Sequence, residues 1–473
     1  MEHGGNLGAA IHEGDKVRIG RRAFLGAGGA LLAAPQFAAA AKPEWRALAE
    51  DVRREMRWSW GKYRELAWGK DEIRPVSGGA KSFPLKDHHL GLSLIEALDT
   101  LWLMELDAEF ADGLNWIKTN LDFDVDGEVS VFETSIRLVG GLLSAWHACG
   151  DPVLLAKARD LTERLLPAFQ ASPLGIPHRY VNLRTGAVRD PATNPAEVGT
   201  FLPEWGFLSN AVGDDRYRAA AKTAAVALFD RRSKIGLLAD RIDAMTGQWL
   251  SRRASIGPPV DSYFEYLWDG WQLLGDRDCR AMYRACTAAI LGHQRAELDG
   301  RLWFVDVDFE TGERINWEQD ELSSFYGGLL AQGGERRTGE AYTESWATLQ
   351  ARFGVLPEGI DVSTGKVGYK TNSLRPELAD AAFNHWLIDR DERWRHLVGD
   401  HYLAMKRWNR APHGYTDLAD VTVEPKVQAD HCPGYWWSEQ MKYYWLIFSD
   451  CPRFNYRRNY LSTEGNVLRG LHR

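Results

Sequence analysis

Six acidic residues recur along the chain at or near the predicted starts of successive helices, with a spacing of about sixty residues. A single acid in a first helical turn is explained by the helix dipole, which contributes about 0.3 to 1 kcal/mol. That explanation weakens for six acids in register, so we expect their carboxyl groups to gather at one end of the molecule. The six are Glu133, Glu204, Asp261, Glu321, Glu377 and Glu439.

Aromatic and arginine residues accompany four of these acids. Glycoside hydrolysis requires a protonated acid, an ionised base and a surface on which the sugar can stack. The pattern therefore indicates a cavity that could hydrolyse a glycosidic bond. The four segments are Phe132-Glu133-Thr134, Asp261-Ser262-Tyr263-Phe264-Glu265, Arg375-Pro376-Glu377 and Tyr435-Trp436-Trp437-Ser438-Glu439.

A second motif overlaps the first of these segments. Asp122, Asp124, Asp126, Gly127 and Glu133 match the EF-hand calcium loop at every required position. EF-hands usually work in pairs, and the sequence holds no second loop of this kind. Residues 129–132 also alternate more like a short strand than like a calcium loop. The EF-hand is therefore our second interpretation of this segment.

The composition argues against several other classes of protein. A net charge of −8 does not suit nucleic-acid binding, which rests on clustered Lys and Arg. His88 and His89 follow no metal-ligand spacing, and no nucleophile elbow or phosphate loop follows residue 41. The 20 Trp residues could stack on sugars, but large core residues in a helical protein are the simpler interpretation.

Five cysteines without a CxxC pair indicate neither a zinc site nor a disulfide framework. Cys279 and Cys286 lie in one predicted helix, roughly 10 Å apart along its axis, which is too far for a disulfide. We expect mostly free, buried thiols.

The N-terminus carries Arg21-Arg22 followed by a short apolar stretch and a small-residue cleavage site, the pattern of a twin-arginine export signal. The apolar stretch is too short to anchor the chain in a bilayer. We predict that residues 1–41 are cleaved and that residues 42–473 form a single domain working in a bacterial periplasm or outside the cell.

The elements that must position the acids are helices. Apolar residues recur three or four positions apart after residue 43, and short helix-to-helix junctions follow each other about sixty residues apart. In these junctions a Gly ends one helix and an Asp starts the next. The junctions are Gly150-Asp151, Gly213-Asp214, Gly275-Asp276, Gly333-Gly334, Asp389-Arg390-Asp391 and Ser449-Asp450, with Leu106-Asp107 as an earlier, seventh one.

Small β-hairpins are predicted between the helix pairs, with turns at Thr185-Gly186, Thr246-Gly247, Thr311-Gly312 and Thr364-Gly365. A repeat of two helices cannot bury its apolar face alone, so neighbouring pairs must pack side by side. Seven pairs would close into an all-α (α/α)7 barrel. An open solenoid is the alternative, although these repeats diverge more than solenoid repeats usually do.

Around the same residues the chain resembles glycoside hydrolase family 47, the class I α-mannosidases. The resemblance runs from about Trp60 to Leu468, and it implies an (α/α)7 barrel. It rests on seven ordered motifs, which are AWGKDEIRPVSG (67–78), IEALDTLWLM (95–104), VFETSIRLVGGLLSA (131–145), DSYFEYL (261–267), LRPE (374–377), SEQMKYYWLIFSD (438–450) and STEG (462–465).

The resemblance implies roles for three carboxylates. Glu133 would be the general acid, acting through a water, and Glu377 the base that activates the attacking water. Asp261 would be the third catalytic carboxylate and a rival candidate for the acid. The family inverts configuration, so we expect the operative acid and base to be about 6.5 to 9.5 Å apart.

Calcium is implied by the same resemblance. Thr463 would bind Ca²⁺ through its carbonyl and hydroxyl, with waters and two sugar hydroxyls completing a shell of six to eight oxygens. Arg137 could instead be only an intrahelical partner of Glu133, four residues before it. The residues implied to bind substrate or to support the site are Arg137, Glu265, Arg375, Tyr435, Glu439 and Glu464.

The chain departs from the family pattern at two places. Residues 320–325 replace a His-Leu pair and a disulfide-forming Cys of many members, which puts that wall and that disulfide in doubt. Pro259 stands where an Arg helps some members choose a glycan branch, so branch preference does not transfer.

We therefore expect an exported, calcium-dependent, inverting exo-α-1,2-mannosidase that acts as a monomer on mannose-terminated oligosaccharides. A non-catalytic glycan-binding relative is the alternative. An (α/α)-barrel sugar epimerase is a third option, but it would need His pairs across the cavity, and none is placed for that role.

Overall fold

The computed structural model describes residues 45–469. The predicted export signal, residues 1–41, lies outside the described residues. Within the described part of the chain, no helix is long and apolar enough to cross a membrane.

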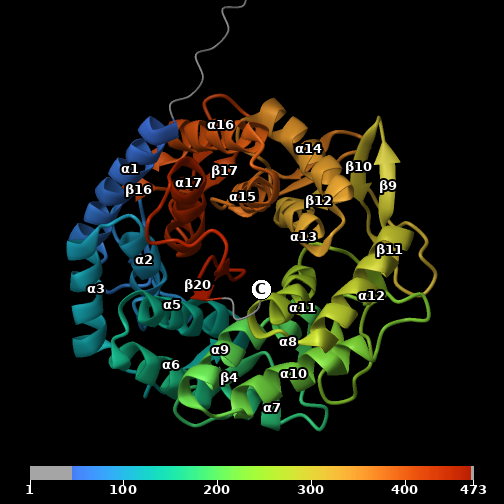
Figure 1. Ribbon diagram of the computed structural model, residues 1–473, viewed down its shortest axis with the longest axis horizontal. Helices are drawn as coiled ribbons and strands as arrows, with labels where there is room; N and C mark the ends of the chain where they lie inside the picture. The colour runs from blue at the N-terminus through green and yellow to red at the C-terminus, as the bar shows by residue number, and fades with distance from the viewer. Residues whose placement is uncertain (1–44, 470–473) are drawn as a thin grey trace, which may run out of the picture. The chain divides into compact units, whose positions relative to one another are not determined.

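Helices arranged as two concentric rings dominate residues 45–469 (Figure 1). The inner helices are almost wholly buried: in α17 every residue is buried, and in α2 only Trp102 is partly exposed. The inner ring comprises α2 (Leu92–Leu103), α5 (Gly140–Cys149), α9 (Leu202–Val212), α11 (Asp261–Leu274), α13 (Tyr326–Gly333), α15 (Glu377–Asp389) and α17 (Met441–Phe448).

The outer helices bury one face against the inner ring and expose the other, which suits their three-and-four apolar spacing. They are α3 (Asp107–Asn120), α6 (Pro152–Leu165), α10 (Arg216–Phe229), α12 (Arg277–His293), α14 (Arg336–Phe353), α16 (Glu392–Trp408) and α1 (Trp45–Leu66). Seven inner helices packed against seven outer ones confirm the predicted all-α (α/α)7 barrel.

The junctions within the barrel are capped largely as predicted. Gly150 ends α5 in the left-handed conformation at φ 73°, and the Asp151 carboxylate accepts the Val153 N–H at 3.1 Å. Asp276 caps α12 by accepting the N–H groups of Asp278 and Cys279. Asp107 starts α3, so the seventh junction is confirmed.

The predicted junction at Ser449-Asp450 is wrong. No helix follows α17 within the described residues, and the chain continues instead to a hairpin of β19 (Asn459–Leu461) and β20 (Val467–Arg469). The outer partner of α17 is α1, which packs against it from the N-terminal side. Residues 450–459 lack the apolar spacing of a helix, and a polar pair after a helix marks only the end of that helix.

Short antiparallel strands connect the helix pairs, and the four predicted hairpin turns are confirmed. In each turn a Gly at φ near 70° donates its N–H to the carbonyl of an Asn or Asp four residues earlier. The strands are β1 (Glu72–Ile73), β2 (Ala80–Lys81), β3 (Glu128–Ser130), β4 (Tyr180–Asn182), β5 (Val188–Arg189), β6 (Ala192–Thr193), β7 (Ile242–Asp243), β8 (Arg253–Ala254), β9 (Arg295–Leu298), β10 (Arg301–Phe304), β11 (Val307–Asp308), β12 (Glu318–Asp320), β13 (Gly359–Asp361), β14 (Lys366–Tyr369), β15 (Arg410–Ala411), β16 (Gly414–Tyr415), β17 (Leu418–Asp420) and β18 (Val427–Gln428).

Short helical segments lead into several inner helices and place side chains at one end of the ring. They are α4 (Val131–Glu133), the π-helix η1 (Thr134–Val139), α8 (Pro195–Gly199), the 3₁₀ helix η2 (Glu321–Phe325) and the π-helix η3 (Trp436–Gln440); α7 (Pro167–Gln170) follows α6. Single-turn π segments often occur at functional sites.

All five cysteines lie within the described residues, and none forms a disulfide. Cys149 is exposed and the other four are buried, as predicted.

Candidate active site

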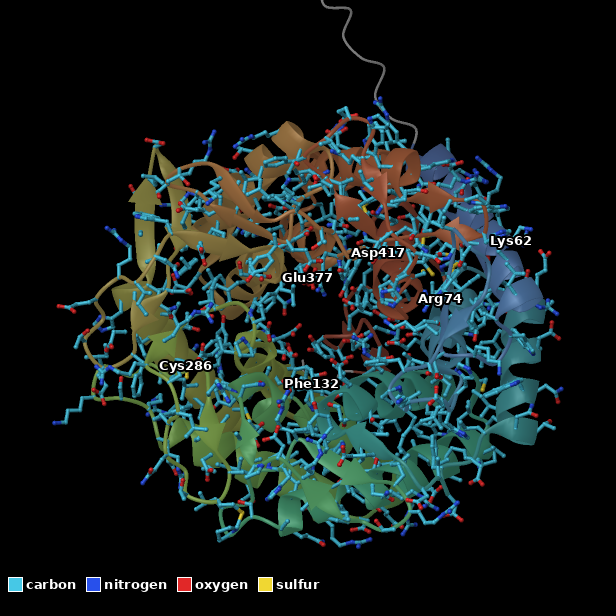
Figure 2. The ribbon with its side chains drawn as sticks, turned by 180° about the vertical axis from the view of Figure 1, so that it is seen from behind. Lys62, Arg74, Phe132, Cys286, Glu377 and Asp417 are labelled. Atoms are coloured by element: carbon cyan, nitrogen blue, oxygen red, sulfur yellow. The ribbon has the colours of Figure 1, made fainter. Side chains whose placement is uncertain are left out.

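A cavity of about 240 Å³ lies inside the ring, at the end where the inner helices α11 and α15 begin. Figure 2 shows Glu377 and Phe132 beside the centre of the ring. The charged residues that line the cavity are Glu133, Arg137, Glu197, Asp261, Glu265, Arg375, Glu377, Asp380, Glu439 and Glu464. All nine residues predicted for catalysis, substrate or calcium therefore line one cavity.

Two of the six acids in register do not reach this cavity. Glu204 is fully buried and accepts a hydrogen bond from the Tyr266 hydroxyl at 2.7 Å. Glu321 is fully buried and accepts one from the Asn372 amide at 2.8 Å. The expectation that all six gather there is wrong for these two, because both carboxyl groups are packed among neighbouring elements.

Arg137 organises one wall of the cavity. Its Nε donates to Glu133 at 2.7 Å, and its Nη1 lies 3.1 Å from both Glu96 and Glu464. Burial opposes the charge of Arg137, but these three carboxylates raise the pKa of its guanidinium well above the usual value. Arg137 is thus both the intrahelical partner of Glu133 and a residue of the cavity.

Glu377 stands in the first turn of α15, where its Oε2 is buried without a hydrogen-bond partner. Burial raises the pKa of Glu377 to about 8, although the neighbouring Arg375 opposes this shift. Both Nε and Nη2 of Arg375 lie 3.2 Å from the Glu358 carboxylate, which fixes the guanidinium beside the cavity.

Asp261 occupies the equivalent first-turn position in α11. Its Oδ1 accepts the Ser262 N–H at 2.8 Å. Burial raises the pKa of Asp261, while the Ser262 hydrogen bonds and the charge of Arg375 partly offset that rise. Asp261 and Glu377 thus enter the cavity from adjacent parts of the ring under similar electrostatic conditions.

The cavity floor carries more carboxyl groups than cations. The Thr463 hydroxyl is hydrogen-bonded to Glu265, and Asp380 accepts from Asn384 at 2.9 Å. Burial and mutual repulsion raise the pKa of Glu265 and Glu439 well above usual, and burial raises that of Asp380 to about 7.

This oxygen-rich floor fits calcium, which accepts carboxylate, carbonyl, hydroxyl and water oxygens. A divalent cation would offset the repulsion among the carboxylates, and Oε2 of both Glu377 and Glu464 lacks a hydrogen-bond partner. Thr463 lines the floor at the turn between β19 and β20, as the calcium prediction requires.

The rival EF-hand loop has a different arrangement. Asp124 is bound to Arg184, and Asp126 accepts from Asn182. Glu133 points instead to Arg137 in the cavity. Residues 45–469 hold no group of three or more His, Cys, Asp or Glu side chains arranged for a metal ion, so the loop does not form an EF-hand site.

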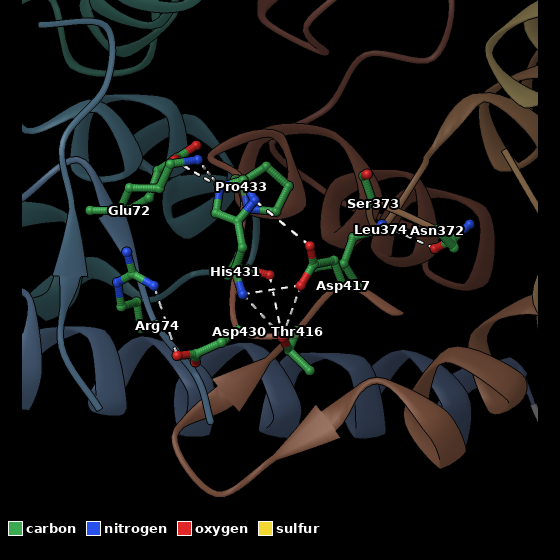
Figure 3. A network of polar contacts seen from close by, with 12 residues as sticks. Glu72, Arg74, Asn372, Ser373, Leu374, Thr416, Asp417, Asp430, His431 and Pro433 are labelled. Carbon is green, nitrogen blue, oxygen red and sulfur yellow. Dashed lines mark hydrogen bonds and ion pairs between the residues drawn. The ribbon is translucent and has the colours of Figure 1, made fainter. Parts of the chain in front are cut away.

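The loop that delivers Tyr435 is held by a polar network between distant parts of the chain (Figure 3). His431 Nε2 lies 2.8 Å from Glu72 Oε2, and the His431 N–H donates to Asp417 at 3.0 Å. The Tyr435 hydroxyl then donates to the Ser373 carbonyl at 2.6 Å. The Tyr435 ring is thereby fixed beneath the guanidinium groups, 5.3 Å from that of Arg137.

The aromatic walls come from Phe132, Phe325, Tyr435 and Tyr443. No tryptophan of residues 45–469 lines this cavity, and Trp436 and Trp437 are buried in the core. The core interpretation of the tryptophans is therefore confirmed for these two, and the expectation that they face the cavity is wrong.

Sequence reasoning missed two acids of the site. Asp380 follows Glu377 by three residues, so helix geometry alone could have placed both on one face. Glu96 lies in the middle of the apolar helix α2, where no local pattern marks it as a partner of Arg137. The departures noted at Pro259 and Leu322 line the cavity wall.

The fold and site together define an (α/α)7 barrel with a carboxylate-lined central cavity. The model of glycosyl hydrolase family 47 matches residues 55–470. The chain therefore belongs to glycosyl hydrolase family 47.

Similar proteins carry mannosidase names. Mannosyl-oligosaccharide alpha-1,2-mannosidase IA of Drosophila melanogaster is 31% identical over 430 residues, which are 85% of this chain and 64% of that protein. This chain thus spans less than two thirds of that relative's length. Mannosyl-oligosaccharide 1,2-alpha-mannosidase IB of Homo sapiens is 30% identical over 450 residues, 89% of this chain and 70% of that protein.

A solved structure supports the same architecture. The alpha-1,2-mannosidase from Trichoderma reesei matches with a TM-score of 0.81 at 23% identity, covering 90% of this chain and 99% of that chain. At this identity the likeness concerns the fold.

Proposed function

We propose that this protein is an exported, calcium-dependent, inverting exo-α-1,2-mannosidase acting on mannose-terminated oligosaccharides. The observation that carries the proposal is the convergence of Glu133, Asp261 and Glu377 on one cavity in a member of this family. A cavity of about 240 Å³ suits a single terminal sugar rather than a long chain.

In the proposed reaction, Glu133 delivers a proton through a water to the glycosidic oxygen, while Arg137 holds its carboxyl group in place. Glu377 accepts a proton from the water that attacks the anomeric carbon. Asp261 is the alternative proton donor. The predicted acid-to-base separation of about 6.5 to 9.5 Å leaves room for the attacking water.

Several groups of the chain would prepare Glu377 for this role. Its empty-cavity pKa of about 8 means that it must be ionised by bound cations before it can act as a base. Arg375 supplies one positive charge. Thr463 would hold Ca²⁺, which supplies a second positive charge and oxygen coordination for sugar hydroxyls.

The test is hydrolysis of α-1,2-linked mannobiose, followed by proton NMR with and without a calcium chelator. We expect β-mannose as the first product and loss of turnover on chelation. Initial α-mannose would contradict inversion alone. Retained glycan binding without turnover would establish the alternative, a non-catalytic mannose-binding relative.

Export is a separate part of the proposal. We propose that residues 1–41 are a cleaved twin-arginine signal and that residues 42–473 are the catalytic domain, working as a monomer. Mass spectrometry of the protein secreted by a bacterial host should find an N-terminus close to Lys42. An uncleaved cytoplasmic product would contradict this part.

A further inference from the structure

A second cavity, of about 680 Å³, opens near the opposite ends of the same inner helices. Along α11, Asp261 lines the first cavity and Gln272 the second, and 11 residues of helix separate them by about 16 Å. We call the second one the junction cavity, because Arg390 of the α15 to α16 junction lines it. The two cavities share only a wall, formed by Glu265, Phe325 and Asp380.

The junction cavity is lined mainly by side chains that can hydrogen-bond without carrying charge, alternating with rings. Four amides and four aromatic residues contribute, and two arginines lie among them. They are Gln272, Gln332, Asn384 and Asn459; Phe383, Phe454, Tyr456 and Tyr460; and Arg390 and Arg457. The described residues form no ion pair with either arginine.

Asp269 reaches into this cavity from the middle of α11. It is only 2% exposed, and its Oδ2 has no hydrogen-bond partner. Burial and the nearby Glu265 raise its pKa well above usual, while a hydrogen bond with Tyr460 opposes the shift. A buried polar atom without a partner costs about 1 to 3 kcal/mol, so a ligand hydroxyl at this position would be favourable.

The lining excludes other classes of small ligand. A metal ion is disfavoured because the described His, Cys, Asp and Glu residues form no suitable group of three. An anion would meet Asp269, Glu265 and Asp380 at the inner wall, and an organic cation would meet both arginines. A neutral polyhydroxylated ligand can accept from the arginines and donate to the carboxyl groups.

We propose that the junction cavity is a second saccharide-binding site, which takes a neutral saccharide of one to three units independently of hydrolysis. Its volume lies within the range of about 300 to 1,000 Å³ for small-molecule sites. The four rings supply apolar faces for the sugar, and the amides with Asp269 supply polar partners for its hydroxyls.

The test uses the Glu377→Gln protein, so that the probe survives. Calorimetric titration with α-1,2-mannobiose, and separately with cellobiose, counts the sites, and crystals soaked in each sugar locate them. We expect two mannobiose sites per chain. Adding Gln272→Trp, which fills the junction cavity, should remove one site, whereas Gln170→Trp on the exposed surface should leave both.

Folding of the Gln272→Trp protein is checked by thermal unfolding, and Asn459→Trp fills the same cavity from the loop side as a second variant. A site lost in either filling variant supports the proposal even if the catalytic cavity binds no sugar, so the proposed function fails separately. An unchanged number of sites in both variants, with soaked crystals showing an empty junction cavity, would overturn it.

Discussion

At the scale of single residues, the carboxyl group of Glu377 combines chemical usefulness with an unfavourable environment. It is buried at Oε2 without a partner, and burial raises its pKa to about 8. Groups held in such surroundings are common at catalytic positions, where function takes precedence over stability.

Replacing Glu377 by Gln should therefore separate activity from stability. We expect kcat for α-1,2-mannobiose to fall by about 10² to 10⁴-fold, the usual contribution of a general base. The melting temperature should stay equal or rise, since no carboxylate has to be buried. Glu335→Gln, at an exposed position, is the control for both measurements. Full activity in Glu377→Gln would remove this residue from the catalytic role.

Gly434 allows the close approach that positions Arg137. A Cβ atom at this residue would lie 1.6 Å from Oε2 of Glu96, whose Oε1 accepts from Arg137. Gly434→Ala should displace Glu96 and loosen the contact between Arg137 and Glu133. We expect kcat/KM to fall by about tenfold, with about 1 to 3 kcal/mol of stability lost through overpacking.

Gly61 of α1 is the matched control, because an added Cβ meets nothing within 4 Å there. Gly61→Ala should leave kcat/KM unchanged and stabilise the fold by about 0.4 to 1 kcal/mol. Urea unfolding and steady-state kinetics measure both variants. Equal activity of the two alanine variants would show that Glu96 does not position Arg137.

At the scale of elements, the packing of α16 on α17 buries His401. Its Nδ1 lies 2.8 Å from the Tyr444 hydroxyl, and burial lowers its pKa to about 4. The unfolded chain takes up a proton at pH near 6.5, whereas the folded chain remains neutral until about pH 4. Stability is therefore lost progressively as the pH falls between these two values.

The loss attributable to His401 should approach about 3 kcal/mol below pH 4. His401→Gln should make the free energy of unfolding less dependent on pH between 6.5 and 4.5, by close to one proton. Urea titrations at several pH values measure this slope, with the exposed His88→Gln as the control. An unchanged slope in His401→Gln would refute the assignment.

At the scale of the whole molecule, local signals predicted the helix pairs but not how the ring closes. The caps at Gly150-Asp151 and Gly275-Asp276 are written in adjacent residues, so a regular period could be read from them. The pairing of α1 with α17 joins residues at the two ends of the described chain, and no adjacent residues encode it.

The site divides in the same way. Glu133, Asp261 and Glu377 follow from helix starts and from family motifs, while Glu96 and Glu358 reach the site through folding alone. Glu204 and Glu321 show the limit of the register argument, because a shared helix position does not decide which way a side chain packs.

Calcium should stabilise the barrel as a whole, since Thr463 stands on the β19 to β20 turn while Glu265 and Asp380 stand on α11 and α15. An ion that binds only the folded state adds about 2.7 kcal/mol at a concentration one hundred times its dissociation constant. We expect the melting temperature to rise by a few degrees in 1 mM Ca²⁺ relative to EDTA, since about 1 kcal/mol shifts it by a few degrees.

Magnesium should give a smaller rise, because it demands a compact octahedral shell and releases water reluctantly. Thr463→Val keeps the shape of the side chain but removes the hydroxyl, so it should abolish most of the calcium-dependent rise and also lose the hydrogen bond to Glu265. Differential scanning fluorimetry of both proteins in EDTA, Mg²⁺ and Ca²⁺ separates these two effects. The rise with Ca²⁺ is the readout, because it compares each protein with itself. A calcium-dependent rise of equal size in Thr463→Val would move the ion away from this turn and toward the carboxylates alone.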